Sequence, residues 1–146
     1  MLKVLFVCTG NFYRSRFSEA IFNNQVQVRE IQALAFSRGF YTHRVNPRSL
    51  LNGNELSTFT RQALIERNIS LDLTGSRRMP LTVEDLDDAH RIIAMSEHEH
   101  KAMALELFPD YVGRIEFWNF PDLPVPPEQT LPKIEEAVIE LVNTLV

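Results

Sequence analysis

The sequence predicts an α/β fold: a single domain with a four-stranded parallel sheet that carries helices on both faces. Two observations predict it. Four short apolar runs alternate along the chain with segments whose apolar residues recur at helical spacing, a pattern typical of a parallel sheet covered on both sides. The length of 146 residues and the 45% content of hydrophobic residues suit one core. We therefore expect residues 1–146 to form one domain.

The predicted strands are continuous apolar runs, as expected for strands that are buried on both faces of a sheet. In chain order they are KVLFVC at 3–8, IQALAF at 31–36, RIIAM at 91–95 and RIEFW at 114–118. The first run ends at Cys8, which is the only cysteine of the chain. The end of that strand is therefore the first place to look for chemistry.

The predicted helices lie between these strands. Helical periodicity or richness in helix formers marks the segments 14–28, 56–67 and 97–107. Thr82, with Asp85 three residues later, has the spacing of a helix start. The last helix is the clearest, and Pro132 is expected in its first turn. Its apolar residues at helical spacing are Ile134, Val138, Leu141 and Leu145.

The net charge of −4 hides an uneven distribution along the chain. Residues 1–80 carry 11 Lys and Arg against 5 Asp and Glu, whereas residues 81–146 carry 4 against 14. The part that contains the cysteine is thus the part that would attract an anion. The basic residues are scattered and the pI of about 5.6 is acidic, so we expect no nucleic-acid partner.

Several other classes of protein and site are not expected. The apolar run Val4–Cys8 is far shorter than a membrane span or a signal-peptide core, so we expect a soluble, cytoplasmic protein with no membrane partner. One cysteine permits no intramolecular disulfide and no multi-thiol zinc site. His98 and His100 point to different faces of a helix at their i, i+2 spacing. We expect no metal and no cofactor, and we interpret these histidines as part of a solvated first turn.

The segment CTGNFYRS joins the first predicted strand to a predicted helix that begins at Arg14. Residues 9–13 then form a loop at the helix N-terminus, where unpaired N–H groups and the helix dipole favour an anion. Gly10 allows a close backbone approach, and Asn11 tolerates left-handed dihedrals, so several N–H groups can turn inward. The planar guanidinium of Arg14 suits two phosphate oxygens.

The same positive surroundings favour the thiolate form of Cys8, and Ser15 could donate a hydrogen bond to the sulfur. Such a loop presents a nucleophile beneath a bound phosphate, which suits transfer of a phosphoryl group to sulfur. A free cysteine at a strand end is more often a small buried hydrophobe. The functional interpretation therefore rests on the complete set of strand, Cys8, Gly10, Asn11, Arg14 and Ser15, followed by a helix.

CTGNFYRS resembles the signature of the low-molecular-weight protein tyrosine phosphatases: Cys, two residues, Gly-Asn, two residues, then Arg-Ser after the first strand. The resemblance continues through RSRFSEAIF, FSRG at 36–39, TRQALIERNI, SRRMPLTVEDL and RIIAMSEHE at 91–99. It covers most of the chain and implies the strand order 2-1-3-4. The site would then lie at the carboxyl end of the first strand, beside the point where the strand order reverses.

The resemblance implies a role for each matching residue. Cys8 looks like the nucleophile that becomes phosphorylated, and Arg14 looks like the residue that clamps the phosphoryl oxygens. Asn11 and Ser15 match positions that hold the shape of the loop and stabilise the thiolate, and Ser37 resembles the serine that supports the asparagine. The residues expected to bind phosphate are Thr9, Gly10, Asn11, Phe12, Tyr13 and Ser15.

The stretch NFPDLPVPPEQT at 119–130 holds four of the eight prolines and is expected to be a stiff loop after the fourth strand. By resemblance, its Asp122 is the general acid that protonates the leaving oxygen and later takes a proton from the attacking water. Leu123 follows where the family commonly has proline. Asp110 is the nearest rival, although it precedes the fourth strand, where a role in a turn is expected.

The expected activity is hydrolysis of phosphate monoesters through a phosphocysteine, with a phosphotyrosine protein or a small aryl phosphate as substrate. Leu123, Pro124 and Val125 stand where the family often has tyrosines, so the pocket wall is aliphatic here. A relative that binds phosphate or another oxyanion without turnover is the alternative, and a pure interaction domain is a third. Arsenate reductases of similar fold relay electrons through further cysteines, which this chain lacks.

Overall fold

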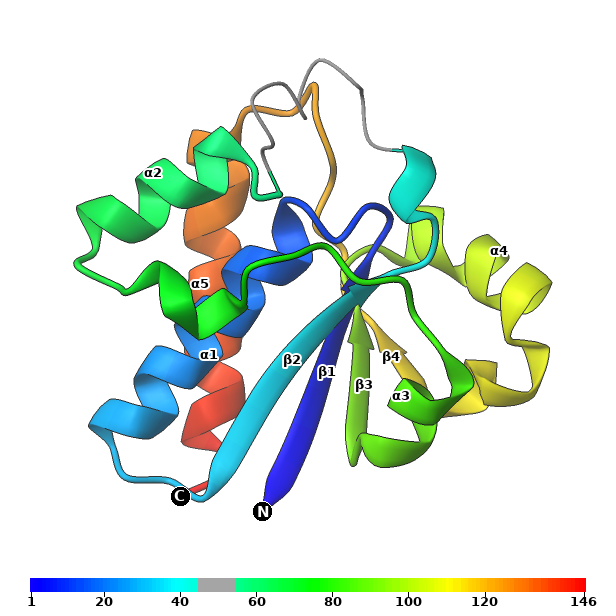
Figure 1. Ribbon diagram of the computed structural model, residues 1–146, viewed down its shortest axis with the longest axis horizontal. Helices are drawn as coiled ribbons and strands as arrows, with labels where there is room; N and C mark the ends of the chain where they lie inside the picture. The colour runs from blue at the N-terminus through cyan, green and yellow to red at the C-terminus, as the bar shows by residue number, and fades with distance from the viewer. Residues whose placement is uncertain (45–54) are drawn as a thin grey trace.

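The computed structural model describes residues 1–44 and 55–146. Its centre is a parallel sheet of four strands in the order β2-β1-β3-β4, as expected (Figure 1). The strands are β1 (Leu2–Cys8), β2 (Ala33–Gly39), β3 (Arg91–Ala94) and β4 (Ile115–Phe117). Because all four run in the same direction, their carboxyl ends lie at one edge of the sheet, at the top of Figure 1.

Helices cover both faces of the sheet, as predicted. The α-helices are α1 (Arg14–Val28), α2 (Thr58–Glu66), α3 (Val83–Asp88), α4 (Glu97–Leu107) and α5 (Pro127–Asn143). Short 3-10 helices are η1 (Thr42–Arg44), η3 (Leu71–Thr74) and η4 (Pro109–Arg114). Helices α1, α2 and α5 lie on one side of the sheet, and α3 and α4 lie on the other (Figure 1).

The central strand β1 divides the core into two parts, because its side chains alternate between the faces of the sheet. Val4, Phe6 and Cys8 belong to the apolar cluster beneath α1 and α5, whereas Leu5 and Val7 belong to the cluster beneath α3 and α4. All five are buried. The alternation therefore places the thiol of Cys8 on the face that α1 covers.

Most predicted boundaries differ by one or two residues from those observed, and the differences are largest for the second strand and the last helix. The second strand begins at Ala33 and continues to Gly39, because its register is set by pairing with β1, residue for residue up to Cys8. Helix α5 begins at Pro127, so the prediction that Pro132 lies in the first turn is wrong; Pro132 lies within the helix. Pro127 starts the helix earlier because a proline at the first helical position has a preset φ and needs no N–H partner.

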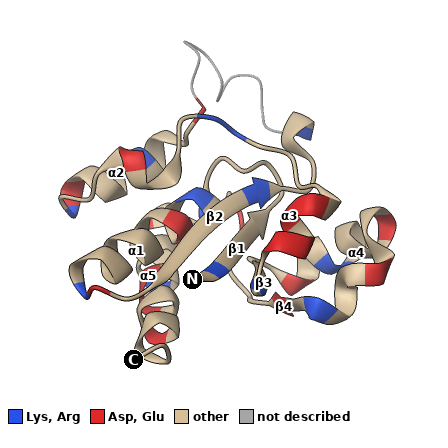
Figure 2. Ribbon diagram, turned by 60° about the horizontal axis from the view of Figure 1, so that its bottom comes forward, with Lys and Arg blue, Asp and Glu red and all other residues tan. Residues whose placement is uncertain are grey.

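The start of α3 is as predicted. The hydroxyl of Thr82 accepts a hydrogen bond from the backbone N–H of Asp85, and the Asp85 side chain accepts one from the N–H of Thr82. This capping box begins a helix whose sequence is mostly acidic, as Figure 2 shows. The acidic excess of the C-terminal part thus lies partly on α3, on the side of the sheet opposite α1.

Candidate active site

The loop of residues 9–13 connects β1 to α1 at the carboxyl edge of the sheet (Figure 1). Asn11 has a φ of 51°, in the left-handed region that asparagine tolerates. Within the described ranges 1–44 and 55–146, the backbone N–H groups of residues 10–13 donate no hydrogen bond. Unpaired N–H groups beside a helix N-terminus form an anion-binding site.

Cys8 lies at the base of this loop and is only 3% exposed. Its Sγ is 3.0 Å from the Oγ of Ser15, the second residue of α1. The sequence predicted this pair from their positions on either side of the loop. The serine hydroxyl is placed to donate a hydrogen bond to a thiolate.

The side chain of Asn11 holds the loop from behind. Its Nδ2 donates to the Oγ of Ser15 at 3.0 Å and to the Oγ of Ser37 at 2.9 Å, and its Oδ1 accepts from the N–H of Met79 at 2.8 Å. Ser37 in turn donates to a carboxylate oxygen of Glu19 at 2.7 Å. The structure therefore brings together Asn11, Ser15 and Ser37, as the resemblance implied.

The contacts that join Asn11, Ser37 and Glu19 have a fixed direction. The hydroxyl of Ser37 donates to Glu19, so its oxygen accepts from Asn11. The oxygen of Ser15 also accepts from Asn11, and the Ser15 hydroxyl hydrogen remains able to point toward the sulfur of Cys8. Burial raises the pKa of Glu19, although hydrogen bonds from Ser37 and Thr74 act in the opposite sense. The network therefore fixes the position of the Ser15 hydroxyl beside the sulfur.

Arg14 is buried at the start of α1, where two carboxylates and a carbonyl surround it. Its Nη1 and Nη2 donate to the two carboxylate oxygens of Glu99 at 2.6 and 3.0 Å. Nη1 also donates to the carbonyl oxygen of Phe120 at 2.8 Å, and Nη2 lies 3.5 Å from Asp122 Oδ2. Burial alone would raise the pKa of Glu99, but the hydrogen bond and charge of Arg14 lower it.

These contacts use most of the donors of Arg14. The buried Nε has no hydrogen-bond partner in the part of the chain that the structure describes. An unpaired buried donor is unfavourable unless a ligand satisfies it. The Nε of Arg14 is therefore available to an anion, whereas the terminal nitrogens already bind Glu99.

Asp122, the expected general acid, lies in the loop between β4 and α5. Its side chain is 48% exposed and close to the guanidinium of Arg14. It borders a cavity of about 470 Å³ lined by Ser96, His98, Glu99, Asn119, Pro121, Asp122 and Leu123. The rival Asp110 lies in η4, which precedes β4, and thus at the amino-terminal ends of the strands. Only Asp122 of these two is near Arg14.

The expectation that His100 lies in a solvated turn is wrong. His98 is exposed, but His100 is fully buried and stacks on Phe40 with ring centroids 5.6 Å apart. Its Nδ1 accepts a hydrogen bond from the N–H of Ser96, and its Nε2 lies 3.0 Å from Thr9 Oγ1. Burial and the charge of Arg14 lower the pKa of His100 to about 4. His100 is therefore neutral and contacts the side chain of Thr9, the first residue of the loop.

Phe12 and Tyr13 complete the loop. The carbonyl of Phe12 accepts a hydrogen bond from the N–H of Ser57, and that of Tyr13 accepts from the Thr60 hydroxyl, so both tie the loop to the segment that begins α2. The Tyr13 ring is buried, and burial, together with the charge of Asp122, raises its pKa to about 12. Both residues anchor the loop beside the site.

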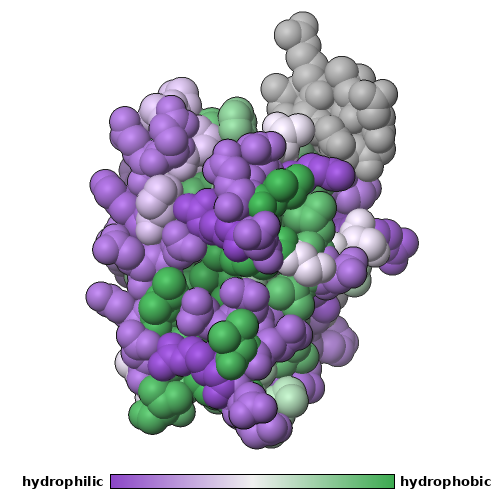
Figure 3. Space-filling view, turned by 90° about the vertical axis from the view of Figure 1, so that its left-hand side faces the viewer, coloured by the Kyte–Doolittle hydropathy of each residue, from purple (hydrophilic) through white to green (hydrophobic). Residues whose placement is uncertain are grey.

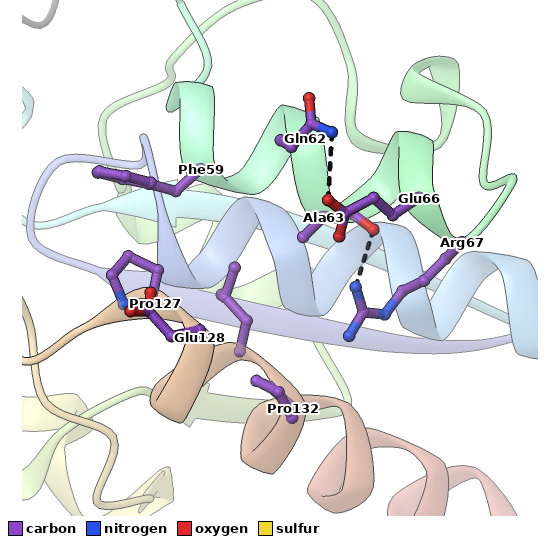
Figure 4. A pocket seen from close by; sticks show the side chains of 9 residues that line it. Phe59, Gln62, Ala63, Glu66, Arg67, Pro127, Glu128 and Pro132 are labelled. Carbon is purple, nitrogen blue, oxygen red and sulfur yellow. Dashed lines mark hydrogen bonds between the residues drawn. The ribbon is translucent and has the colours of Figure 1, made fainter.

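A separate cavity of about 250 Å³ lies between α2 and α5 (Figure 4). Residues that line it include Phe59, Ala63, Leu131 and Pro132. Figure 3 shows this side of the molecule, where apolar side chains are scattered among polar ones. Neither Cys8 nor any other predicted site residue borders it. The cavity is therefore distinct from the candidate active site.

Sequence reasoning missed Glu99 and His100 as parts of the site. Glu99 is the last residue of the segment RIIAMSEHE and His100 follows it directly, but the resemblance assigned neither residue a role. Among residues 1–44 and 55–146, no group of three or more His, Cys, Asp or Glu side chains is placed to hold a metal ion. No helix in those ranges has the length and apolar character to cross a membrane.

Residues 3–145 match the family described as low molecular weight phosphotyrosine protein phosphatase. A curated relative, the protein-arginine-phosphatase of Bacillus subtilis (strain 168), is 30% identical over 114 residues, which cover 78% of this chain and 68% of that protein.

Two solved structures share the fold over nearly the whole chain. The low molecular weight protein tyrosine phosphatase from T. tengcongensis is 26% identical, with a TM-score of 0.80, over 99% of this chain and 100% of that one. A mutant of YwlE from Bacillus subtilis is 25% identical, with a TM-score of 0.79, over 99% of both chains. The similarity therefore extends well beyond the loop that contains Cys8.

Proposed function

The chain belongs to the low molecular weight phosphotyrosine protein phosphatase family, a family of enzymes that hydrolyse phosphate esters, and we propose that it dephosphorylates tyrosine residues of proteins through a phosphocysteine intermediate. The single observation that carries this proposal is the position of the lone thiol, at the base of a loop whose N–H groups have no acceptor among the described residues. A reducing compartment such as the cytoplasm suits an enzyme that depends on one free thiol.

In the first step, the thiolate of Cys8 attacks the phosphorus atom of the bound phosphate monoester. The S–P bond forms as the bond from phosphorus to the leaving oxygen breaks. The loop N–H groups and Arg14 stabilise the charge on the other phosphoryl oxygens. Asp122 gives its proton to the leaving oxygen, so that the alcohol departs neutral.

In the second step, water attacks the phosphorus of phosphocysteine. Asp122, now a carboxylate, takes one proton from the water, and the S–P bond breaks to restore the thiolate of Cys8. Phosphate then leaves the loop. Ser15 supports the sulfur as leaving group because its hydroxyl lies 3.0 Å from Cys8 Sγ.

Phosphoarginine is a second candidate substrate. The curated relative is named a protein-arginine-phosphatase. The cavity beside Asp122 includes the carboxylates of Glu99 and Asp122, and no Phe, Tyr or Trp side chain is among the described residues that line it. Carboxylates suit a guanidinium leaving group, whereas an aryl group gains more from aromatic walls.

The test is an assay of the purified chain with p-nitrophenyl phosphate, a phosphotyrosine peptide and a phosphoarginine peptide. We expect turnover of p-nitrophenyl phosphate, a higher kcat/KM for the phosphotyrosine peptide, and loss of turnover in Cys8→Ser with vanadate binding retained. A higher kcat/KM for the phosphoarginine peptide would favour the second candidate. Vanadate binding without any turnover would indicate a non-catalytic relative, and absence of both would indicate an interaction domain.

A further inference from the structure

Arg16 is a buried cation directly behind the phosphate loop. It lies in the first turn of α1, two residues after Arg14, and is only 1% exposed. It does not border the cavity beside Asp122. Burial lowers the pKa of Arg16, with the charges of Glu19 and Cys8 acting in the opposite sense, but a guanidinium remains charged in proteins.

The guanidinium of Arg16 joins three segments of the chain. Its Nε donates to the carbonyl oxygen and the hydroxyl of Thr74 at 3.0 and 2.7 Å. Its Nη2 donates to the carbonyl of Gly75 at 2.9 Å, and its Nη1 to that of Glu55 at 2.8 Å. Nη1 also lies 3.5 Å from the carbonyl oxygen of Asn11, in the loop itself. A lysine, with its single nitrogen, could not make this set of contacts.

Arg78 makes a similar contact at the preceding peptide. Its Nη1 donates to the carbonyl oxygen of Gly10 at 3.2 Å and also to that of Thr42. The carbonyl groups of Gly10 and Asn11 are thus both turned toward arginines. Because C=O and N–H point in opposite directions across a planar trans peptide, the N–H groups of Asn11 and Phe12 are turned the other way. These are two of the loop N–H groups that make no hydrogen bond with the described residues.

We propose that Arg16 is a positioning residue that fixes the Asn11–Phe12 peptide with its N–H toward the oxyanion and places a permanent positive charge behind Cys8. This inference rests on the proposed function, since it concerns how the same loop is held. Among the described residues, Arg16 makes no hydrogen bond to Cys8 and does not border the cavity beside Asp122, so its effect is exerted through the loop and through its electric field. Arg78 supports the neighbouring peptide.

The charged groups around Arg16 come from four elements. Glu19 faces it from α1, Cys8 from β1, Glu55 from the segment before α2 and Arg78 from the segment after η3. The two carboxylates balance the two arginines, and a substitution of Arg16 leaves both carboxylates in place. Removing the charge of Arg16 therefore leaves excess negative charge near the thiolate and disfavours its formation.

The experiment compares wild type with Arg16→Gln and Arg16→Lys by two measurements. The first is the pH dependence of alkylation of the lone thiol by iodoacetamide, and the second is the affinity for vanadate. Arg67→Gln is the control, because Arg67 is a partly exposed arginine that is paired with Glu135 at 2.9 Å and makes no hydrogen bond to residues 9–13 of the loop. Thermal unfolding identifies variants that do not fold.

We expect Arg16→Gln to shift the alkylation profile to higher pH and to weaken vanadate binding about 10- to 100-fold, in line with the loss of charged hydrogen bonds. Arg16→Lys should keep the alkylation profile near that of wild type but still weaken vanadate binding, because charge is retained and geometry is lost. Wild-type vanadate affinity in a folded Arg16→Lys or Arg16→Gln would overturn the inference. Failure of wild type itself to bind vanadate would instead contradict the proposed function, and the alkylation profiles would still test the effect of the Arg16 charge.

Discussion

The guanidinium of Arg14 and the carboxylate of Glu99 form a two-point ion pair, with nitrogen–oxygen distances of 2.6 and 3.0 Å. The pair joins the first turn of α1 to the first turn of α4. Since both terminal nitrogens of Arg14 bind Glu99, the orientation of the guanidinium plane is fixed before any substrate arrives. The edge that carries Nε is left for the anion.

Glu99→Gln should lower kcat/KM for an aryl phosphate about 100-fold. Without the ion pair the guanidinium of Arg14 can rotate, so it is no longer held in the one orientation that suits the phosphoryl oxygens. Steady-state kinetics with p-nitrophenyl phosphate measures this. The matched control is Glu97→Gln on the same helix, where the only ion pair of the carboxylate with a described residue is an exposed contact of 3.7 Å with Lys101. Equal activity in the two variants would show that Glu99 does not position Arg14.

Asp122→Asn should lower kcat by about 10²- to 10⁴-fold for substrates with a poor leaving group, because the amide has no proton to donate. The effect should shrink for activated aryl phosphates, whose leaving oxygen needs little protonation. The comparison requires a series of phenyl phosphates of differing leaving-group pKa. Asp110→Asn serves as control and should behave as wild type. If Asp122→Asn leaves the dependence on leaving group unchanged, the acid is elsewhere.

Gly39→Ala should displace the backbone of the loop of residues 9–13. A Cβ at this position would lie 2.7 Å from the carbonyl oxygen of Thr9 and 2.8 Å from the backbone nitrogen of Asn11. Both are backbone atoms, so the loop must shift. We expect weaker vanadate binding and a free energy of unfolding lower by about 1–3 kcal/mol. Gly113→Ala, where a Cβ meets no described atom within 4 Å, should retain wild-type vanadate affinity; equal loss in both variants would contradict the account.

The buried His100 should make stability depend on pH. Its pKa falls from the ordinary 6.5 to about 4 in the folded protein, so between these values the unfolded chain binds a proton that the folded chain does not. The contribution of His100 to the free energy of unfolding is fully present above pH 6.5. It decreases as the pH falls toward 4, by about 3 kcal/mol in total.

Chemical denaturation of wild type and His100→Gln at a series of pH values measures this contribution. The variant should be less stable near pH 7 but should lose less stability on acidification. Glu19, whose pKa burial raises, acts in the opposite sense, but it is present in both proteins and cancels in the difference. Parallel curves for the two proteins between pH 6.5 and 4 would contradict the assignment.

The sequence was sufficient to predict the strands and the centre of the loop, because both depend on local signals, whereas the strand order was implied by the family resemblance. A continuous apolar run specified β1, and the Gly-Asn step with Arg-Ser placed the loop and the start of α1 directly after it. The predicted contact between Cys8 and Ser15 spans only seven residues. Patterns of this kind can be recognised within one short window.

The surroundings of the loop were not predictable in the same way. Glu99 meets Arg14 across 85 positions of the chain, and His100 meets Thr9 across 91. Arg16 and His100 are fully or almost fully buried, whereas charged and polar side chains are mostly exposed, so a single sequence gives no sign of their burial. The register of β2 likewise depended on pairing with β1 and shifted its boundaries by two or more residues.

Covalent trapping tests the central claim most directly. Asp122→Asn is mixed with an excess of p-nitrophenyl phosphate, quenched within milliseconds and digested for peptide mapping by mass spectrometry, with Cys8→Ala as control. We expect one phosphate on the sulfur of Cys8 and none in the control. Turnover without phosphate on Cys8, or phosphate on another residue, would contradict the claim that this thiol is the nucleophile.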